Sequence, residues 1–411
     1  MAEPYGREGL PLEEARAQIL GALQPLGASE QQPLRLALGR TLAAAVHAAA
    51  AVPGFRASIM DGYAIAGDVQ PQPGEHWRLV GTSAAGAPHG AVLAAGEAVR
   101  ILTGAVLPEG SGWVLPQELM SLEGDRLALV RPCGANPWIR QPTEEAEPGQ
   151  ELAAAGQRLG VAELGRLASC GVQQVALTRQ PRIGLLISGN ELLPPGVDRG
   201  AGQIWESNST LLTALLEQLG HGVAGQRVVA DQPEPLRQAL LELAAGSDVV
   251  VSTGGVSSGD SDWIRPLVAE LGEVRFWKLF LKPGRPFAWG QVAGVPFFGL
   301  PGNPVAAAIT ALQLLWPALQ RLEGAEIQVW PRLKVRLEAA LRRGAGRPEL
   351  ARAQLVVAAD GELWARLGGS QASSRIGSLQ GADLLLEIPA ELGDLEAGTA
   401  LWAQLLRLPM F

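Results

Sequence analysis

The chain has 411 residues, of which 47% are hydrophobic, and it carries a formal net charge of −8. This length predicts roughly two to four domains of ~100–200 residues, each with enough apolar residues to form a buried core. The negative charge, without any block of basic residues, argues against a duplex nucleic-acid ligand, because neutralising phosphates requires a basic face.

The first 180 residues predict a helical domain interrupted by a small β domain. Proline, two glutamates and apolar residues at helical spacing indicate a helix over 11–25. The alanine-rich segment 41–52 is interpreted as a packed helix that ends at Pro53. Short apolar runs between glycines and prolines then indicate short strands, before a helical pattern returns at 162–171. These patterns predict a helical domain in two parts, 1–50 and 146–178, with a β domain inserted at 51–145.

From about residue 180 the pattern alternates between apolar strand, glycine loop and helix. Apolar runs such as IGLLIS and VPFFGL are each followed by a glycine-containing loop and a helical pattern. This alternation indicates a parallel α/β sheet. We therefore predict an α/β multidomain protein, with a central parallel-sheet domain at 179–326 and a C-terminal β domain at 327–411.

The cysteine content and the N-terminus bear on where the protein acts. Cys133 and Cys170 form neither a metal-binding motif nor a disulfide framework, so a reduced, cytoplasmic setting is expected. The first ten residues lack a signal-peptide pattern, and no run approaches ~18 apolar residues. We expect no membrane association.

Polar loops follow three of the predicted parallel strands, where ligands bind in open α/β sheets. These loops span 188–191, 253–262 and 300–304, and a fourth loop at 282–286 follows another apolar stretch. Their glycines let a ligand approach the backbone, and the helices that follow offer N–H groups to an anion.

Lysine is scarce in this chain, with only Lys278, Lys282 and Lys334 among 33 basic residues. If Lys278 and Lys282 lie on one strand, their side chains face the same side and can enter one cleft, next to Arg285. Lysine provides a compact, strongly hydrated charge that suits a phosphate or another oxyanion. The alternative is that both lysines are ordinary solvated surface residues.

Five acidic residues occupy loop positions: Asp61, Glu191, Asp231, Asp260 and Asp262. Carboxylates repel an anion unless a cation bridges them, and Mg²⁺ does this with one or two carboxylates, ligand phosphates and water. Together with the lysines, they predict a magnesium–phosphoester ligand. The alternative for each acid alone is a helix cap or a turn former, most of all for Asp231.

Familiar nucleotide-binding and hydrolase motifs are absent or incomplete. The chain has no GxGxxG and no Gly-Lys-Ser/Thr, which argues against a classical dinucleotide fold and a Walker A loop. Residues 255–259, GVSSG, match a nucleophile elbow with Ser257 as nucleophile, but all four histidines precede it. A differently ordered triad through His221 leaves a serine hydrolase as a remote alternative.

A set of short motifs occurs in a fixed order along almost the whole chain. They are MDGYA (60–64), TGA (103–105), SGNEL (188–192), GQIWESN (202–208), STGGVSSGDSD (252–262), FWKLFLKPGRPF (276–287), GLPGNPV (299–305) and GGSQASSRIGSL (368–379). Each is weak alone, but in this order they resemble the molybdopterin molybdenumtransferase family, which inserts molybdate and is related to the gephyrin E domain.

The resemblance implies a cytoplasmic homodimer of four-domain subunits with a molybdopterin-binding α/β domain. It implies an Mg²⁺-dependent transferase that cleaves adenylylated molybdopterin, inserts molybdate into the dithiolene and releases AMP. Other proteins of molybdenum cofactor biosynthesis would be further partners. The alternative within the same fold is a non-catalytic carrier or scaffold that binds molybdopterin or the finished cofactor without turnover.

The resemblance also implies roles for residues at the motif positions. The catalytic group would be Asp61, Glu191, Asp231, Asp262, Lys278 and Lys282, with Glu191 and Asp262 as metal ligands. Substrate and oxyanion binding would fall to Thr103, Ser257, Arg285, Pro286, Gly302, Asn303, Arg352 and Ser373. Lys282, Arg285 and Arg352 would bind the oxyanion through charge-assisted hydrogen bonds. Some of these groups would come from the second subunit.

Three positions depart from the family pattern. Asn190 stands where the family usually has aspartate, Arg285 where it has lysine, and Ala306 where it has serine. These changes remove a carboxylate, replace a point donor by a planar fork, and remove a neutral hydrogen bond worth about 0.5–1.5 kcal/mol. They leave open a weaker molybdate site or a preference for tungstate, and those at Asn190 and Ala306 favour the carrier.

Overall fold

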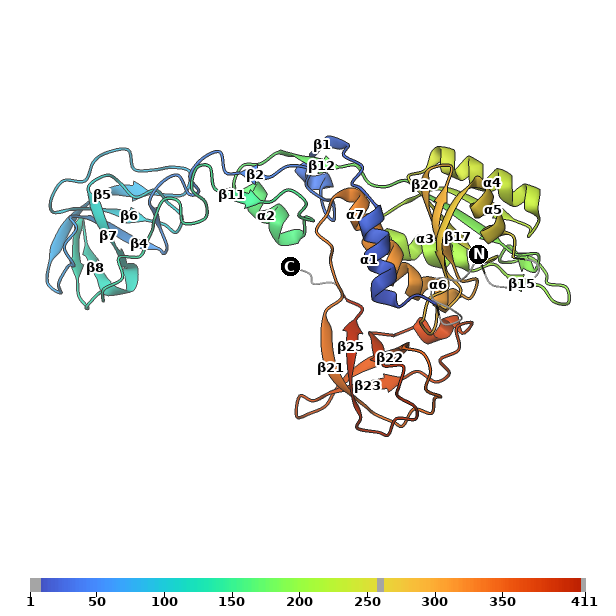
Figure 1. Cartoon of the computed structure of the whole chain (residues 1–411). Helices are drawn as coiled ribbons and strands as arrows, with labels where there is room; N and C mark the ends of the chain where they lie inside the picture. Colours follow the sequence, from blue (N-terminus) through green and yellow to red (C-terminus); the bar gives the residue numbers. More distant parts are fainter. Residues whose placement is uncertain (1–8, 257–261, 408–411) are drawn as a thin grey trace.

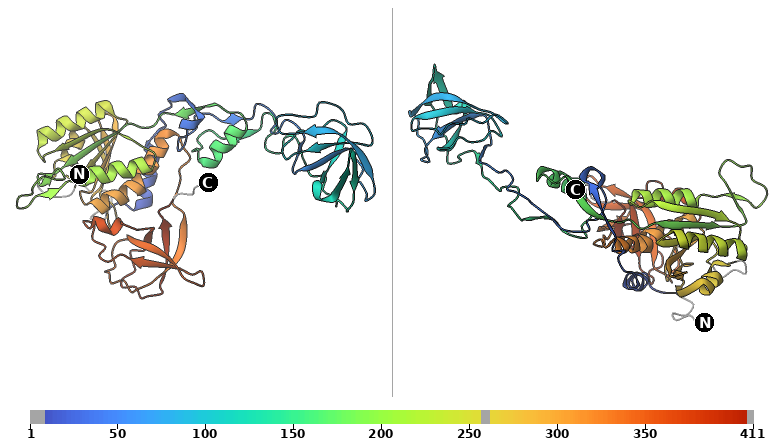
Figure 2. Two further views of the ribbon diagram at one scale, coloured as in Figure 1. Left: turned by 180° about the vertical axis from the view of Figure 1, so that it is seen from behind. Right: turned by 90° about the horizontal axis from the view of Figure 1, so that it is seen from above.

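The structure is a computed structural model that describes residues 9–256 and 262–407 of the chain. The chain is elongated: a small β domain lies at one end of a narrow arm, and the other end joins a central α/β domain beside a C-terminal barrel (Figure 1). Two further views show the same separation of the small β domain from the rest (Figure 2). The multidomain α/β fold class expected from the sequence is confirmed.

The small β domain is a six-stranded sheet with apolar residues on both faces. Its strand order is β7 (Ser111–Pro116), β4 (Gly62–Ala66), β6 (Glu97–Ile101), β5 (His76–Ser83), β9 (Arg126–Leu129) and β8 (Met120–Glu123). Neighbouring residues point to opposite sides, so Val114 packs in one buried cluster and Leu115 in the other. The domain thus has its own core.

The arm consists of two chain segments that run side by side, one leaving and one returning. β1 (Ser29–Pro33) pairs with β12 (Gln174–Thr178), β2 (Val46–His47) with β11 (Glu151–Ala153), and β3 (Ala57–Ser58) with β10 (Ile139–Arg140), all antiparallel. The short helix α2 (Val161–Ser169) packs beside them. The helix predicted over 41–52 is wrong, because pairing with the returning segment overrides the helix propensity of alanine there.

The helix predicted over 11–25 is confirmed as α1 (Leu12–Ala22), with Glu13 and Glu14 in its first turn. It lies outside the arm, against the central domain, where Ala15 and Ile19 are buried in the main core. It packs against α7 (Trp316–Glu323), so α1 belongs to the same domain as the loops that follow the central strands.

The central sheet has six strands, of which four are parallel. β16 (Val223–Val229), β13 (Ile183–Ser188), β17 (Val249–Thr253) and β20 (Val295–Leu300) are parallel neighbours in that order. β19 (Ala288–Val292) and β18 (Gly272–Trp277) then add an antiparallel edge. The prediction of a parallel sheet holds for the first four strands. At the edge, Ala293 and Gly294 both have positive φ and form a tight hairpin turn.

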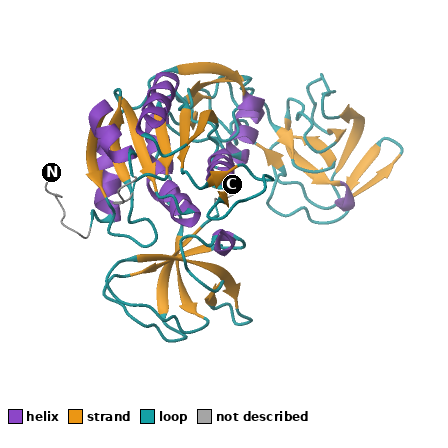
Figure 3. Cartoon of the chain, turned by 90° about the vertical axis from the view of Figure 1, so that its right-hand side faces the viewer, coloured by secondary structure: helices purple, strands orange, loops and turns teal. Residues whose placement is uncertain are grey.

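Helices cover both faces of the central sheet (Figure 3). α3 (Asn208–Gln218), α6 (Pro304–Thr310), α1 and α7 contribute to the core on one face, and α4 (Pro233–Gly246) and α5 (Ile264–Leu271) to the core on the other. A π-helical turn (Ala311–Leu315) joins α6 to α7. By length and composition the combined helix Pro304–Glu323 could cross a membrane, but 94% of its apolar window is buried inside the protein, as in a core helix.

The C-terminal domain is a closed five-stranded barrel. Its strands run in the order β21 (Arg332–Leu337), β23 (Leu363–Leu367), β22 (Glu349–Val357), β24 (Leu384–Ile388) and β25 (Ala400–Leu405). The start of β22 runs beside Lys282 of the central domain, which joins the two domains at the edge of the loops.

Candidate functional site

A cavity of about 990 Å³, here called the main cavity, lies where the central strands end. It is lined by the loops after β13, β17 and β20, by residues 282–286 and by the barrel residues 371–374. This is the carboxyl edge of the parallel strands, where open α/β sheets bind their ligands. The main cavity collects these predicted site residues: Glu191, Asp231, Asp262, Lys282, Arg285, Pro286, Gly302, Asn303 and Ser373.

The carboxylates of the main cavity affect one another. Burial raises the pKa of Asp231, and the negative charges of Glu191 and Asp262 raise it further, in spite of the opposing Ser188 hydroxyl. Asn190 accepts a hydrogen bond from the backbone N–H of Asp231 through its Oδ1, at 3.0 Å. An amide at position 190 therefore keeps the acceptor that positions Asp231 and adds no further negative charge to an already acidic group.

Lys282 forms the basic side of the main cavity and is fixed by the barrel. Its Nζ lies 3.1 Å from Oε2 of Glu349, a buried residue at the start of β22. Its backbone N–H donates to the Pro348 carbonyl at 2.9 Å, and its carbonyl accepts from Leu350 N–H at 2.9 Å. The side chain of Lys282 is 45% exposed, so its charge is held in place and remains accessible from the cavity.

The barrel also contacts the first turn of α6. Asn303 donates from Nδ2 to Ser373 Oγ at 2.9 Å, and Val305 N–H donates to the Ser373 carbonyl at 3.1 Å. Ala306, in the same turn, lines the main cavity without a hydroxyl group. These bonds join the barrel loop to the loop after β20, and Asn303 and Ser373 add neutral polar groups to the lining of the main cavity.

Comparison with known proteins decides the family of the chain. Residues 10–171 match the MoeA N-terminal region (domain I and II), residues 184–321 a probable molybdopterin binding domain, and residues 334–406 the MoeA C-terminal region (domain IV). Molybdopterin molybdenumtransferase of Haemophilus influenzae is 32% identical over 394 residues, 95% of this chain and 96% of that protein. The chain belongs to the molybdopterin molybdenumtransferase family.

Two further relatives agree with this family. Gephyrin of Dictyostelium discoideum is 29% identical over 449 residues, which cover 96% of this chain and 62% of gephyrin. The crystal structure of a molybdopterin biosynthesis MoeA protein from Pyrococcus horikoshii has a TM-score of 0.81 at 25% identity, covering 96% of this chain and 99% of that one. The resemblance seen in the ordered motifs is therefore confirmed along nearly the whole chain.

Lys278 does not share a strand with Lys282, so the strand argument from the sequence is wrong. β18 ends at Trp277, and Lys278 leaves the strand with a positive φ of 72°. Its Nζ lies 3.9 Å from the centroid of the Trp277 ring, and Trp277 donates from Nε1 to the Val256 carbonyl at 2.8 Å. Among the described residues, Lys278 is not one that lines the main cavity.

Arg352, which the family pattern assigns to the oxyanion, lies behind the barrel loop instead of on the wall of the main cavity. It is 1% exposed, donates from Nε and Nη2 to Ser378 Oγ at 3.2 Å, and from Nη2 to the Ala372 carbonyl at 3.3 Å. Burial lowers its pKa, opposed by the negative charge of Glu349. Its Nη1 has no hydrogen-bond partner among the described residues, which is the kind of donor that a bound anion would satisfy.

Asp61 and Thr103 lie in the small β domain, which the arm separates from the central domain (Figure 1), and neither residue lines the main cavity. Asp61 Oδ1 accepts hydrogen bonds from the backbone N–H and the Oγ of Thr103, each at 2.8 Å. The bond to the backbone N–H of Thr103 is the main reason why the pKa of Asp61 is lowered. Within one chain these two residues bond to each other and do not line the main cavity. Ser257 and Asp260 lie outside the described residues.

The donor set of the main cavity fits magnesium better than a transition metal. Among residues 9–256 and 262–407 there is no group of three or more His, Cys, Asp or Glu that could hold a metal ion. Glu191 and Asp262 nevertheless both line the main cavity. Magnesium commonly takes only one or two carboxylates and completes its shell with phosphate oxygens and water, so the predicted pair is sufficient.

Two features of the main cavity, which Asn208 and Gly254 both line, were missed from the sequence. Asn208 is buried at the start of α3 and donates from Nδ2 to Thr253 Oγ1 at 3.0 Å and to the Gly302 carbonyl at 2.8 Å, joining two of the loops. Gly254 has a positive φ of 87°, and a Cβ there would lie 2.5 Å from the Ser188 carbonyl oxygen. Asn208 ends the GQIWESN motif, so the motif itself was the available signal.

Proposed function

We propose that the protein is a molybdopterin molybdenumtransferase that inserts molybdate into adenylylated molybdopterin and releases AMP. The observation that carries this proposal is the main cavity, in which Glu191 and Asp262 share one chamber with Lys282 and Arg285. The family membership supports it, because the relative from Haemophilus influenzae carries this name. A cavity of this size fits a ligand as large as a nucleotide-linked pterin.

The basic side of the cavity would bind the oxyanion. Lys282 and Arg285 both line the main cavity, and Asn303 and Ser373 add neutral polar groups next to them. Charge-assisted hydrogen bonds of this kind are roughly twice as strong as neutral ones. Arg352 would act from behind, by holding the loop that carries Ser373 and by offering Nη1 toward an anion.

The acidic side of the cavity would hold Mg²⁺ through Glu191 and Asp262. When bound, the ion supplies charge neutralisation and Lewis-acid polarisation at the phosphoanhydride. Asp231 lies near both carboxylates, and burial keeps its pKa raised. Of the carboxyl groups in the main cavity, Asp231 would therefore be the one to accept a proton from the attacking water.

A homodimer would explain the position of Asp61 and Thr103. The narrow arm separates the small β domain from the central domain (Figure 2), and no residue of the small β domain, which the structure describes in full, lines the main cavity of the same chain. We propose that this domain reaches the main cavity of a second subunit, in the cytoplasm, where other proteins of molybdenum cofactor biosynthesis supply the substrate.

A non-catalytic carrier of the same fold is the second candidate, and Ala306 is the observation that favours it. The missing hydroxyl weakens the oxyanion side of the cavity by about 0.5–1.5 kcal/mol, which reduces affinity without removing it. Asn190 favours the carrier less, because it keeps its hydrogen bond to Asp231.

The test is AMP release by the purified protein with adenylylated molybdopterin, molybdate and Mg²⁺. A transferase releases AMP in a molybdate-dependent reaction, and tungstate in place of molybdate measures the choice of oxyanion. Tight pterin binding with no AMP at any molybdate concentration would instead identify a carrier. Hydrolysis of an ester other than adenylylated molybdopterin, if it disappears in Ser257→Ala, would instead support the serine hydrolase.

A further inference from the structure

A second, smaller cavity borders the Lys282–Arg285 segment. This side cavity has a volume of about 420 Å³. It is lined by Phe280, Lys282, Arg285, Arg343, Arg347 and residues 344–346. Lys282, Arg285 and Arg347 line both the side cavity and the main cavity. These three cations therefore form a common wall between the two chambers.

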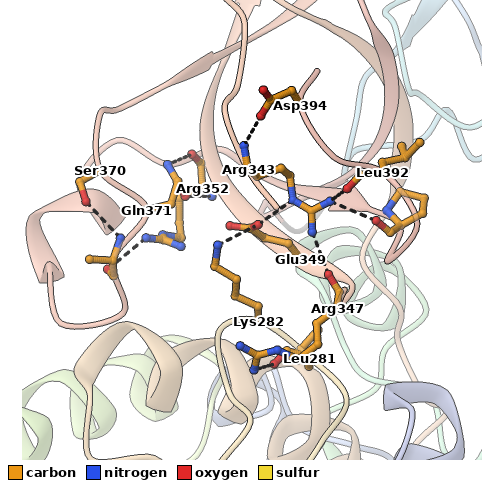
Figure 4. A network of polar contacts seen from close by, with 12 residues as sticks. Leu281, Lys282, Arg343, Arg347, Glu349, Arg352, Ser370, Gln371, Leu392 and Asp394 are labelled. Carbon is orange, nitrogen blue, oxygen red and sulfur yellow. Dashed lines mark hydrogen bonds and ion pairs between the residues drawn. The ribbon is translucent and has the colours of Figure 1, made fainter. Parts of the chain in front are cut away.

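Arg343 and Arg347 flank the short loop 344–346 of the side cavity, and Arg343 has a structural role. Its Nε and Lys282 Nζ both contact Oε2 of Glu349 at 3.1 Å, and the side chains of Arg343 and Glu349 are each 3% exposed (Figure 4). Its remaining nitrogens donate to the carbonyls of Pro389, Leu392 and Arg347. Arg343 thus anchors the loop to the barrel, and Glu349 is already shared between two cations.

Arg343 pairs with the carboxylate of Glu349, whereas Arg347 donates to a backbone carbonyl. A carbonyl does not neutralise the charge of Arg347. Its Nη1 donates to the Leu281 carbonyl at 3.3 Å. Burial and then the positive charge of Arg285 lower the pKa of Arg347, while Glu349 opposes this effect. Two neighbouring guanidinium groups repel each other in a partly buried place, and a bound anion that contacts both removes this repulsion.

We propose that the side cavity is a second anion site, which binds a free tetrahedral dianion with Arg347 as its principal ligand. Inorganic oxyanions such as molybdate, tungstate, sulfate and phosphate share this shape and charge. The side cavity is less than half as large as the main cavity, so it suits such an ion better than an adenylylated pterin. Lys282 and Arg285 face both chambers and connect the two sites electrostatically.

This inference rests on the proposed function only for naming molybdate as the ion that matters. On that basis, the side cavity holds the oxyanion beside the wall of cations while the main cavity is occupied by the pterin substrate. The binding of inorganic ions to the pterin-free protein does not depend on turnover, so it can be measured separately from AMP release.

The first test is calorimetric titration of the pterin-free protein with molybdate, tungstate, sulfate and phosphate. Arg347→Gln should weaken binding of the preferred ion roughly tenfold or more, since one charge-assisted contact is lost. Arg342→Gln is the matched control: Arg342 precedes Arg343, its side chain is 70% exposed, and it pairs with Asp394 and Glu396. Equal effects of the two variants would overturn the proposal and leave only the general charge of the loop.

The second test fills the side cavity without changing any charge. Ala345 lines the side cavity and not the main one, so Ala345→Trp should reduce ion binding at least tenfold. Ala340→Trp, at another exposed alanine outside both linings, should leave it unchanged. Normal ion binding by Ala345→Trp would overturn the inference even if the unchanged protein releases AMP. Absence of AMP release together with the expected ion binding would reject only the proposed function.

Discussion

The two β domains of this chain relate to the main cavity in opposite ways. The C-terminal barrel contacts it directly, through Glu349 at Lys282 and through Ser373 at Asn303. The inserted β domain lies at the far end of the arm, and its predicted site residues Asp61 and Thr103 bond only to each other among the described contacts (Figure 1). One domain therefore completes the site within the subunit, and the other can contribute only across a dimer.

The largest effect is expected at Glu349, through which the barrel contacts Lys282 of the main cavity. Glu349→Gln leaves the buried guanidinium of Arg343 without its carboxylate and releases Lys282. Removing one partner of a buried ion pair costs about 3–5 kcal/mol, so we expect a loss of this size in the free energy of unfolding measured with denaturant. Glu338→Gln, which breaks an exposed pair with Arg366 on the same barrel, should cost about 1 kcal/mol or less. Equal losses would show that the buried contact has no special role.

The inserted domain is tested by mixing two inactive variants. Asp61→Ala and Lys282→Ala should each reduce AMP release roughly 100-fold or more, because each removes a polar group of the proposed site. Co-refolded in equal amounts, they should recover roughly a quarter of the wild-type activity, since half of the dimers then contain one intact composite site. No recovery in a preparation that contains heterodimers would place both residues in the same subunit's site.

The junction between arm and central domain contains a buried histidine whose protonation opposes folding. Burial and the nearby Arg158 charge lower the pKa of His221 to about 3, so its contact with Glu323, at 3.5 Å, involves a neutral imidazole. The unfolded chain takes up this proton near pH 6.5 and the folded chain does not. The contribution to stability is therefore present above pH 6.5 and lost as the pH falls, by about 2 kcal/mol between pH 7 and pH 5.

The measurement is the free energy of unfolding at both pH values for the wild type and for His221→Gln. The variant should lose about 2 kcal/mol less than the wild type over this range. Burial raises the pKa of Glu323, which acts in the opposite direction in both proteins, so the difference isolates His221. The same slope in both proteins would mean that His221 is protonated in the folded state.

The smallest expected effect is at Ala306, in the first turn of α6. Ala306→Ser restores the hydroxyl usual in the family at a residue that lines the main cavity. One added neutral hydrogen bond should tighten oxyanion binding by about 0.5–1.5 kcal/mol, without a change in stability beyond this size. Unchanged affinity in calorimetry would show that the hydroxyl does not reach the oxyanion.

Much of the fold could be predicted because its signals are local. The strands β13 and β20 appear in the sequence as apolar runs. The helix α1 is indicated by an acidic first turn followed by apolar residues at helical spacing. The segment 41–52 could not be predicted, because its conformation is decided by pairing with distant residues between 146 and 177. Closure of the last domain into a barrel depends on pairing between distant strands in the same way.

The candidate site could be predicted where motif loops follow strands, as for Glu191, Lys282 and Asn303. Lys278 could not be placed, because one residue with positive φ ends the strand on which the argument depended. Arg347 was missed, since nothing local marks the loop after β21 as a neighbour of residues 282–285. Only the folded chain brings these two segments together.

The most direct measurement is AMP binding to the main cavity with and without Mg²⁺, for the wild type and for Asp262→Asn. Without metal, removing this carboxylate should strengthen AMP binding, because a negative charge that repels phosphate is lost. With saturating Mg²⁺ the same substitution should weaken AMP binding, because the bridging ion loses a ligand. A change of the same direction under both conditions would contradict a site in which carboxylates and cations bind one metal-bridged anion.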